Sequence, residues 1–340
     1  MNQPKLRGLR GSADAPLHGG RLRQARRLFP SAPEPFIDLS TGINPLPYPV
    51  PPLAPEAWTR LPEPEDIAAL EQAAAKAYRV PDAAQIVAVP GTQSLISLLP
   101  RLFPQDQVAI LSPTYSEYAR AFTAAGTRVL EAATLAELAS ADAAILCNPN
   151  NPDGRRFDAT ALAELVRGRP AGSLLVVDES FCDLEDSGLS LAPRLPLPGV
   201  VILRSLSKTY GLGGLRLGFA LTGPDLATAI RAALGPWPVS GPAIEIGMQA
   251  LSDRSWREAA KGRLGQEVTR LDRMLHQAGL VIVGGTLLFR LASSPTAPEL
   301  FDRLGQAGIL VRKFDYARDW LRFGLPGSED EWQRLAAALA

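Results

Sequence analysis

The chain has 340 residues, which is long enough to bury a large hydrophobic core and favours two domains over one. Lysine and arginine together number 35, as do aspartate and glutamate, and this balance argues against a nucleic acid or a membrane surface as the main partner. Two cysteines and two histidines offer little material for a disulfide framework, a zinc site or a Ser-His-Asp triad, so we expect no metal.

Residues 1–50 are rich in proline, glycine and arginine and lack a steady periodicity, which predicts an arm with short ordered pieces. The basic N-terminus has no apolar segment of the kind that secretory signals carry, and no window reaches about 18 consecutive apolar residues. We therefore expect a cytoplasmic protein without a transmembrane helix. Apolar residues at helical spacing then predict a helix over 63–80.

From residue 86 onward, short apolar segments alternate with segments of helical periodicity. The expected strands cover 86–89, 108–111, 128–130, 143–147, 174–177, 200–203 and 217–221, and helices are expected from 92, 115 and 135 and over 159–167 and 225–234. Strands without polar alternation are buried on both faces, so this rhythm predicts a mostly parallel sheet between helical layers. Ligand-binding residues of such a sheet follow the C-terminal ends of its strands.

The pattern changes after Pro236-Trp237-Pro238. The expected helices there cover 241–251, 254–278, 298–307 and the C-terminus, and shorter strands are expected over 280–283, 287–291, 309–312 and 320–325. This mixture predicts a smaller α+β domain. The expected organisation is an N-terminal arm over 1–45, a large domain over 46–238 and a small domain over 239–340.

Three of the expected strand ends carry polar residues. Gly91 opens a helix, where free backbone N–H groups can bind a phosphate, although many strand–helix turns look alike. The segment NPNNPDG over 148–154 is a rigid turn that either aims Asn151 inward or lies on the surface. Asp178 ends an apolar strand, where its carboxylate needs a cation, from a ligand or a local arginine, or caps a helix.

The segment RSLSKTYGLGGLRLG over 204–218 places Lys208 among small hydroxyl residues, with Arg216 eight positions later. A lysine amine forms a Schiff base with an aldehyde, while hydroxyls and a guanidinium neutralise a phosphate. This combination therefore suits an aldehyde that carries a phosphate, although a basic loop with glycine turns would produce part of the same pattern.

Taken in order, GTQS (91–94), NPNNPDG, DESF (178–181), SLSK (205–208) and Arg216 strongly resemble the motifs of the fold-type I pyridoxal-phosphate enzymes, the class I and II aminotransferase family. The resemblance runs from about residue 38 to residue 324 and implies the fold of pyridoxal-phosphate-dependent transferases. It also implies pyridoxal 5'-phosphate as the cofactor and a homodimer as the assembly.

The resemblance assigns a role to each residue of these motifs. Lys208 holds the cofactor covalently and transfers protons, Asp178 pairs with the ring nitrogen, and Asn151 hydrogen-bonds the phenolic oxygen of the ring. Tyr115 stacks on the ring. The residues implied to bind the cofactor phosphate are Gly91, Thr92, Gln93, Ser205, Ser207 and Arg216.

Two positions depart from the family pattern. Phe181 stands where the family usually has a tyrosine that donates to the phenolic oxygen, which removes a hydrogen bond worth about 1 kcal/mol. Leu61 stands where many relatives have a tyrosine that reaches the neighbouring subunit's cofactor phosphate. Neither departure affects the lysine chemistry.

The arm resembles that of the threonine-phosphate decarboxylases of cobalamin biosynthesis, whose relatives are the histidinol-phosphate aminotransferases. Both act on amino compounds that carry a phosphate monoester. The resemblance implies that Arg322 binds the substrate carboxylate, and the residues expected to complete a site for the substrate phosphate are His18, Gly19, Ser40, Asn44 and Arg312. Alternatively, 18–20 is only a turn and Arg312 a surface residue.

The expected reaction is the decarboxylation of L-threonine O-3-phosphate to (R)-1-amino-2-propanol O-2-phosphate. An aminotransferase that acts on a phosphorylated amino compound is the first alternative, because the bond held perpendicular to the cofactor ring decides between the two reactions. A non-catalytic relative that keeps the fold for binding or regulation is the second, and Lys208, Asp178 and Arg216 argue against it.

Overall fold

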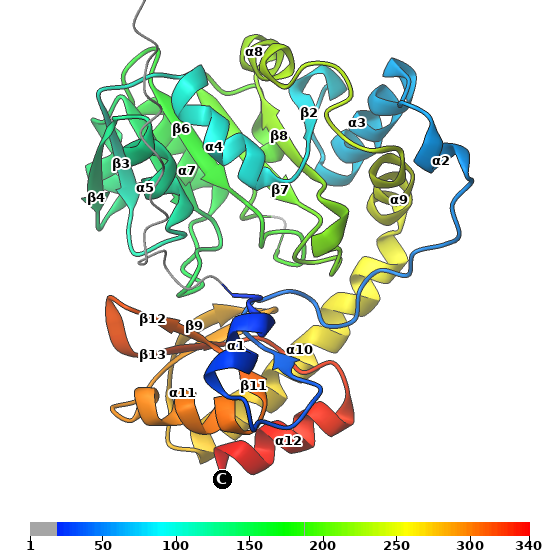
Figure 1. Ribbon diagram of the computed structural model, residues 1–340. Coiled ribbons are helices and arrows are strands. Elements are labelled where there is room, and N and C mark those ends of the chain that lie inside the picture. Colours follow the sequence, from blue (N-terminus) through cyan, green and yellow to red (C-terminus); the bar gives the residue numbers. More distant parts are fainter. Residues whose placement is uncertain (1–18, 187) are drawn as a thin grey trace, which may run out of the picture.

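The computed structural model describes residues 19–186 and 188–340, which form a large domain and a small domain joined by the long helix α10, Arg254–Gln277. Figure 1 shows the large domain, built on one wide sheet, and the small domain at the far end of α10. No helix within the described residues is long and apolar enough to cross a membrane.

The large domain is built on a seven-stranded sheet with the order β2-β8-β7-β6-β5-β3-β4. Its strands are β2 Ile86–Val89, β3 Gln107–Leu111, β4 Arg128–Ala132, β5 Ala143–Cys147, β6 Leu174–Asp178, β7 Val200–Ser205 and β8 Gly218–Thr222. Only β8 runs against its neighbours. The central strands are buried along their whole length, which explains their unbroken apolar sequences.

Helices cover both faces of this sheet, as the sequence predicts. One apolar cluster joins the sheet to α3 Pro64–Tyr78, α6 Leu135–Ala139, α7 Ala159–Arg167 and α9 Gly241–Ser252. A second cluster joins the opposite face to α4 Thr92–Leu102, α5 Glu117–Ala124 and α8 Pro224–Leu234. The carboxyl ends of β5, β6 and β7 therefore open at one edge of a closed three-layer core.

The small domain has a four-stranded antiparallel sheet with the order β12-β13-β10-β9. Its strands are β9 Val281–Thr286, β10 Phe289–Ser293, β12 Arg312–Phe314 and β13 Ala317–Phe323. Helices α10, α11 Ala297–Gln306 and α12 Glu329–Leu339 pack on it in a third apolar cluster. This arrangement is the expected α+β domain.

The N-terminal segment belongs to the small domain, a feature that the sequence did not indicate. Helix α1, Leu22–Leu28, buries Ala25 in the small-domain cluster. Strand β1, Ile37–Asp38, pairs in parallel with β11, Ile309–Leu310, almost a whole chain length away. The short helix α2, Glu56–Thr59, lies beyond it on the way to α3.

Two further details differ from expectation. Helix α9 packs on the large-domain sheet. The boundary between the two hydrophobic cores in this part of the chain therefore lies between α9 and α10, and not at residue 238. The strand expected over 309–312 is two strands: β11 pairs with β1, and after Val311 the chain enters β12, which pairs with β13. One apolar segment thus serves two sheets.

Candidate active site

The turns that carry the predicted cofactor residues meet because of strand register. Gly218 at the start of β8 lies opposite Val89 at the end of β2 and opposite Ser205 at the end of β7. The turn after β2 and the turn after β7 therefore start side by side. Lys208 lies three residues beyond β7, and Asp178 ends the adjacent parallel strand β6.

A tight cradle forms where these turns meet. Gly91 has φ +77°, and a Cβ atom on it would lie 2.5 Å from Nη2 of Arg216. A Cβ atom on Gly218 would lie 3.0 Å from the backbone nitrogen of Thr92, at the start of α4. Only glycine allows such close approaches. The cradle brings the guanidinium group of Arg216 close to the backbone N–H groups at the start of α4.

The other predicted phosphate-binding residues lie around this cradle. Ser205 and Ser207 are buried, and the backbone N–H of Ser207 donates to Oγ of Ser205 at 3.2 Å. Gln93, in the first turn of α4, accepts a hydrogen bond from the Tyr115 hydroxyl at 3.0 Å. The structure therefore gathers all six residues that the resemblance assigned to the cofactor phosphate at one edge of the sheet, together with Tyr115.

Lys208 lies in a site that favours its neutral amine. Burial, together with the charges of Arg322 and Arg216, lowers the pKa of Lys208 to about 8 against the opposing effect of Asp178. The Nζ atom lies 5.5 Å from the centroid of the Phe181 ring. A lysine with a pKa near neutrality is partly unprotonated and is a good nucleophile.

Asp178 keeps its carboxylate buried without a basic partner. Its oxygens accept hydrogen bonds from the Tyr118 hydroxyl at 2.8 Å and from the Ser180 backbone N–H at 2.9 Å. Among the described residues no lysine or arginine nitrogen lies within 4.0 Å of it; local arginine Arg204 instead pairs with Glu179 and Asp183. The sequence also allowed Asp178 to pair with a local arginine or to cap a helix. Within the described residues it does neither.

Tyr118 is a site residue that sequence reasoning missed. It is fully buried on α5, and its pKa lies well above the usual value because of burial and the nearby Asp178 charge. The hydroxyl therefore stays neutral and donates to the carboxylate. The residue follows a helical apolar pattern, so nothing in its local sequence separates it from an ordinary core tyrosine.

The turn over 148–154 faces inward. The sequence had left open whether this turn aims Asn151 inward or lies on the surface. Asn148 and Asn150 are buried, and the side-chain amide of Asn150 donates to the Pro113 carbonyl at 2.9 Å. Asn151 accepts a hydrogen bond from Nη1 of Arg322. The turn thus connects the large-domain sheet to the small domain.

A cavity of about 180 Å³ lies between the two domains at this point. Among the residues that line it are seven that the sequence singled out, namely Gly19, Ser40, Tyr115, Asn151, Lys208, Arg312 and Arg322. Tyr316, which was not singled out, also lines it, although 59% of the residue is exposed. Arg312 is therefore a cavity residue and not a free surface arginine.

Arg312 and Arg322 place two guanidinium groups in this cavity. Nη1 of Arg312 and Nε of Arg322 are buried without a hydrogen-bond partner. Burial and the charge of Arg312 lower the pKa of Arg322 to about 10, while Nη2 of Arg322 donates to the Ser40 carbonyl at 2.6 Å. Two unneutralised cations side by side are unfavourable, and a bound anion would relieve both.

Among the described residues, one predicted member of the substrate-phosphate site, Asn44, does not line the cavity. The amide group of Asn44 is fully engaged: its nitrogen donates to the Thr209 carbonyl at 2.8 Å, and its oxygen accepts from Leu46 and from Arg263. Asn44 therefore holds the chain against the turn of Lys208 instead of facing the cavity. His18 lies outside the described residues.

The comparisons with known proteins agree with this geometry. The family model "Aminotransferase class I and II" matches residues 37–339. The chain is 44% identical to a threonine-phosphate decarboxylase of Sinorhizobium sp, over 95% of this chain and 97% of the relative. It is 41% identical to the enzyme of the same name in Pseudomonas aeruginosa, over 95% and 96%. The histidinol-phosphate aminotransferase of Sinorhizobium meliloti, solved in complex with pyridoxal-5'-phosphate, has a TM-score of 0.82 at 21% identity, over 98% and 97%.

Proposed function

The chain belongs to the class I and II aminotransferase family, and on that premise we propose that it is a pyridoxal-phosphate-dependent decarboxylase of L-threonine O-3-phosphate. The observation that carries the proposal is the cavity in which the amine of Lys208 faces two unneutralised arginines, Arg312 and Arg322. Such a cavity suits a substrate with an amino group and two anionic groups. We place the enzyme in cobalamin biosynthesis, as the resemblance of its arm implies.

The residues present fit the cofactor. Gly91 and Arg216 form a cradle that even a methyl group would block, which suits a phosphate held against backbone and guanidinium. Asp178 is a buried carboxylate that forms no ion pair with any described lysine or arginine, which suits a protonated ring nitrogen. Lys208 would hold the aldehyde carbon, while Tyr115 and Asn151 would contact the ring. Bound pyridoxal phosphate supplies an electron sink for charge that develops at the substrate α-carbon.

The chain's own residues orient the substrate and move its proton. We assign the carboxylate to Arg322, which Ser40 and Asn151 hold in place, and the phosphate to Arg312. Fixing both anions sets which bond of the α-carbon stands perpendicular to the cofactor ring. After carbon dioxide leaves, Nζ of Lys208 delivers a proton to that carbon, and the amine product is released with its phosphate intact.

The test is to incubate the holoenzyme with L-threonine O-3-phosphate in the absence of any keto acid and to measure carbon dioxide. Release of carbon dioxide with one equivalent of aminopropanol phosphate supports the proposal. If instead glutamate forms only when histidinol phosphate and 2-oxoglutarate are supplied, the enzyme is an aminotransferase. Failure to bind the cofactor at all would favour a non-catalytic relative.

We also propose that the protein is a cytoplasmic homodimer. Three large apolar side chains are more than half exposed near α2 and α9, namely Trp58, Leu61 and Trp237. A second copy of the chain would cover such a surface. Light scattering over a range of concentrations tests the assembly, and a monomer at micromolar concentration would contradict it.

A further inference from the structure

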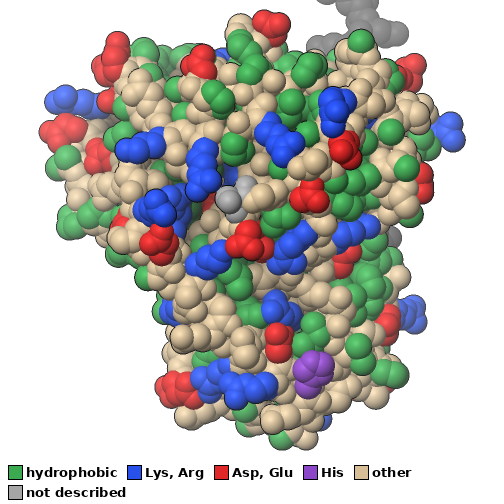
Figure 2. All heavy atoms as spheres, turned by 180° about the vertical axis from the view of Figure 1, so that it is seen from behind, with side chains coloured by type: hydrophobic (Ala, Val, Ile, Leu, Met, Phe, Trp, Pro, Cys, Tyr) green, Lys and Arg blue, Asp and Glu red, His purple; other side chains and the backbone are tan. Residues whose placement is uncertain are grey.

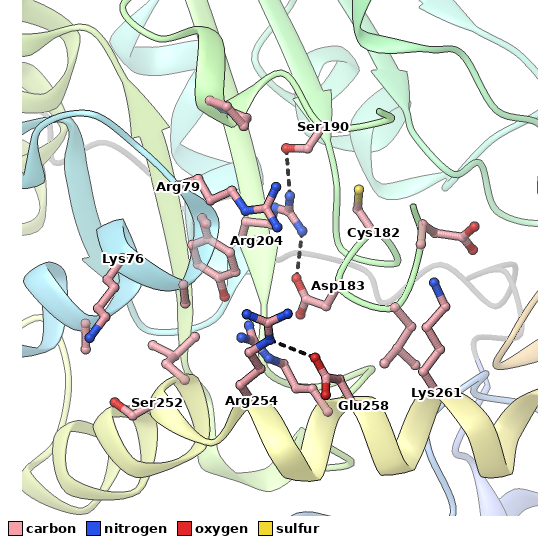
Figure 3. A pocket seen from close by; sticks show the side chains of 18 of the residues that line it. Lys76, Arg79, Cys182, Asp183, Ser190, Arg204, Ser252, Arg254, Glu258 and Lys261 are labelled. Atoms are coloured by element: carbon pink, nitrogen blue, oxygen red, sulfur yellow. Dashed lines mark hydrogen bonds and ion pairs between the residues drawn. The ribbon is translucent and has the colours of Figure 1, made fainter. Parts of the chain in front are cut away.

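A second and larger cavity, of about 520 Å³, lies behind the catalytic turn and shares no lining residue with the cavity of Lys208. Its walls are the end of α3, the segment over 182–186 and the first turns of α10 (Figure 3). Figure 2 shows lysine and arginine side chains gathered along the waist of the molecule on the face seen from behind. Nothing in the proposed reaction uses this cavity.

The charges that line this cavity do not balance. Each of its four carboxylates has a basic partner within 3.0 Å, in the pairs Asp183–Arg204, Glu185–Arg156, Asp186–Lys261 and Glu258–Arg254. Three lining cations have no carboxylate within 4.0 Å among the described residues, namely Lys76, Arg79 and Arg257. The lining has more cations than carboxylates, and Lys76 and Arg79 contribute to this excess, whereas Arg257 interacts electrostatically with Asp183 and Asp253.

Arg79 occupies a backbone position that disfavours it. It is the C-cap of α3 with φ 58° and ψ 36°, the left-handed region in which helices usually end with glycine. A residue with a side chain is disfavoured in that region. The side chain of Arg79 nevertheless lines the cavity (Figure 3). Arg204, which also lines it, pairs with Glu179 and Asp183. The arginine side chain at position 79 thus adds charge to the cavity at a cost to the backbone.

We propose that this cavity binds a small polyanion of the diphosphate class. A volume of about 520 Å³ lies within the range of small-molecule sites. The excess of positive charge in the lining suits the negative charge of a diphosphate at neutral pH, and guanidinium groups bind phosphate oxygens through paired hydrogen bonds. Arg79 comes from the large domain and Arg257 from α10, so the ligand would tie the connecting helix to the large domain.

The experiment is a calorimetric titration of the pyridoxal-phosphate-loaded enzyme with inorganic pyrophosphate at constant ionic strength and without divalent cations. We expect saturable binding to the wild type and at least tenfold weaker binding to Arg79→Gly. This variant removes one cation and gives the left-handed position its preferred residue, so it should fold at least as well as the wild type. Lys76→Met, which removes a second unpaired cation from the cavity, should weaken binding in the same direction.

Two controls separate this cavity from other anion sites. Arg312→Gln alters the proposed substrate site, which can itself take a phosphate group, and should leave the Arg79-dependent component of pyrophosphate binding as it is in the wild type. Arg101→Ala removes an exposed arginine of α4 that has no assigned contact in the cavity and should also bind normally. Equal affinity of Arg79→Gly and wild type, loss of the Arg79-dependent component in Arg312→Gln, or absence of saturable binding would each overturn the proposal.

Discussion

Arg312 and Arg322 are directly opposed neighbours on the antiparallel strands β12 and β13, and both line the cavity that contains Lys208. Like charges at opposed positions of a sheet repel each other. A protein keeps such a pair at the expense of stability when the pair binds an anion. The relationship leads to the first prediction.

Replacement of either arginine with glutamine should lower kcat/KM for L-threonine O-3-phosphate about 10- to 100-fold, since each charged hydrogen bond contributes about 1.5–3 kcal/mol. Arg312→Gln should leave the binding of L-threonine, which has no phosphate, nearly unchanged, whereas Arg322→Gln should weaken both. Arg312→Gln should also raise the melting temperature of the ligand-free protein, because it removes the repulsion. Arg318→Gln, an exposed position of β13, is the matched control. Equal losses for both ligands in Arg312→Gln would contradict the assignment.

Gly91→Ala should reduce the affinity for pyridoxal phosphate about 10- to 100-fold. The new methyl group would displace the guanidinium of Arg216, which costs a charge-assisted hydrogen bond. Gly126→Ala is the control, because Gly126 has a similar φ of +87° and open space around it. Both variants should lose similar stability, and only Gly91→Ala should lose cofactor affinity in an absorbance titration. A matching affinity loss in the control would point to backbone strain instead.

The stability of the cofactor-free protein should depend on the titration of Lys208. The pKa of Lys208 is about 8 in the folded chain, against 10.5 for an ordinary lysine. Between these values the unfolded chain holds a proton that the folded chain has released, so the free energy of unfolding rises with pH. The full rise is on the order of 3 kcal/mol. Urea denaturation at pH 7.5 and pH 10 should show the rise in the wild type and a smaller one in Lys208→Met; parallel curves would refute it.

Arg204→Met should destabilise the fold by about 3–5 kcal/mol, since it leaves the buried carboxylates of Glu179 and Asp183 without their cation. Burial already raises the pKa of both carboxyls, and loss of the arginine should raise them further. Without the arginine, the folded chain favours the protonated form of each carboxyl. The loss of stability should therefore be larger at pH 8 than at pH 5. Arg254→Ala breaks an exposed pair with Glu258 and should cost less than about 1 kcal/mol. Urea denaturation at both pH values measures these differences.

The sequence predicted the elements of the large-domain sheet well. The segments over 86–89 and 143–147 match β2 and β5 at both ends, because strands buried on both faces have unbroken apolar sequences. Lys208, Asp178 and Arg216 were predictable for a related reason. They follow strand ends, and parallel strands bring such residues to one edge.

What the sequence could not predict depends on partners far away in the chain. The pairing of β1 with β11, the packing of α9 on the large-domain sheet and the engagement of Asn44 all join distant segments. Tyr118 was missed because a buried tyrosine of an amphipathic helix has the same local pattern whether its hydroxyl is idle or bound to Asp178. Local periodicity reports burial and does not report partners.

The parallel pairing of β1 with β11 has a consequence for how the protein is made. The ribosome releases Ile37 long before its partner Ile309, which lies far along the chain. The stretch that leads to Ser40 and the Arg322 contact must therefore wait, unpaired, while the sheet of the large domain can already assemble. Segments that lie far apart in the chain close the substrate cavity, so a nascent chain cannot turn over substrate before β13 has emerged.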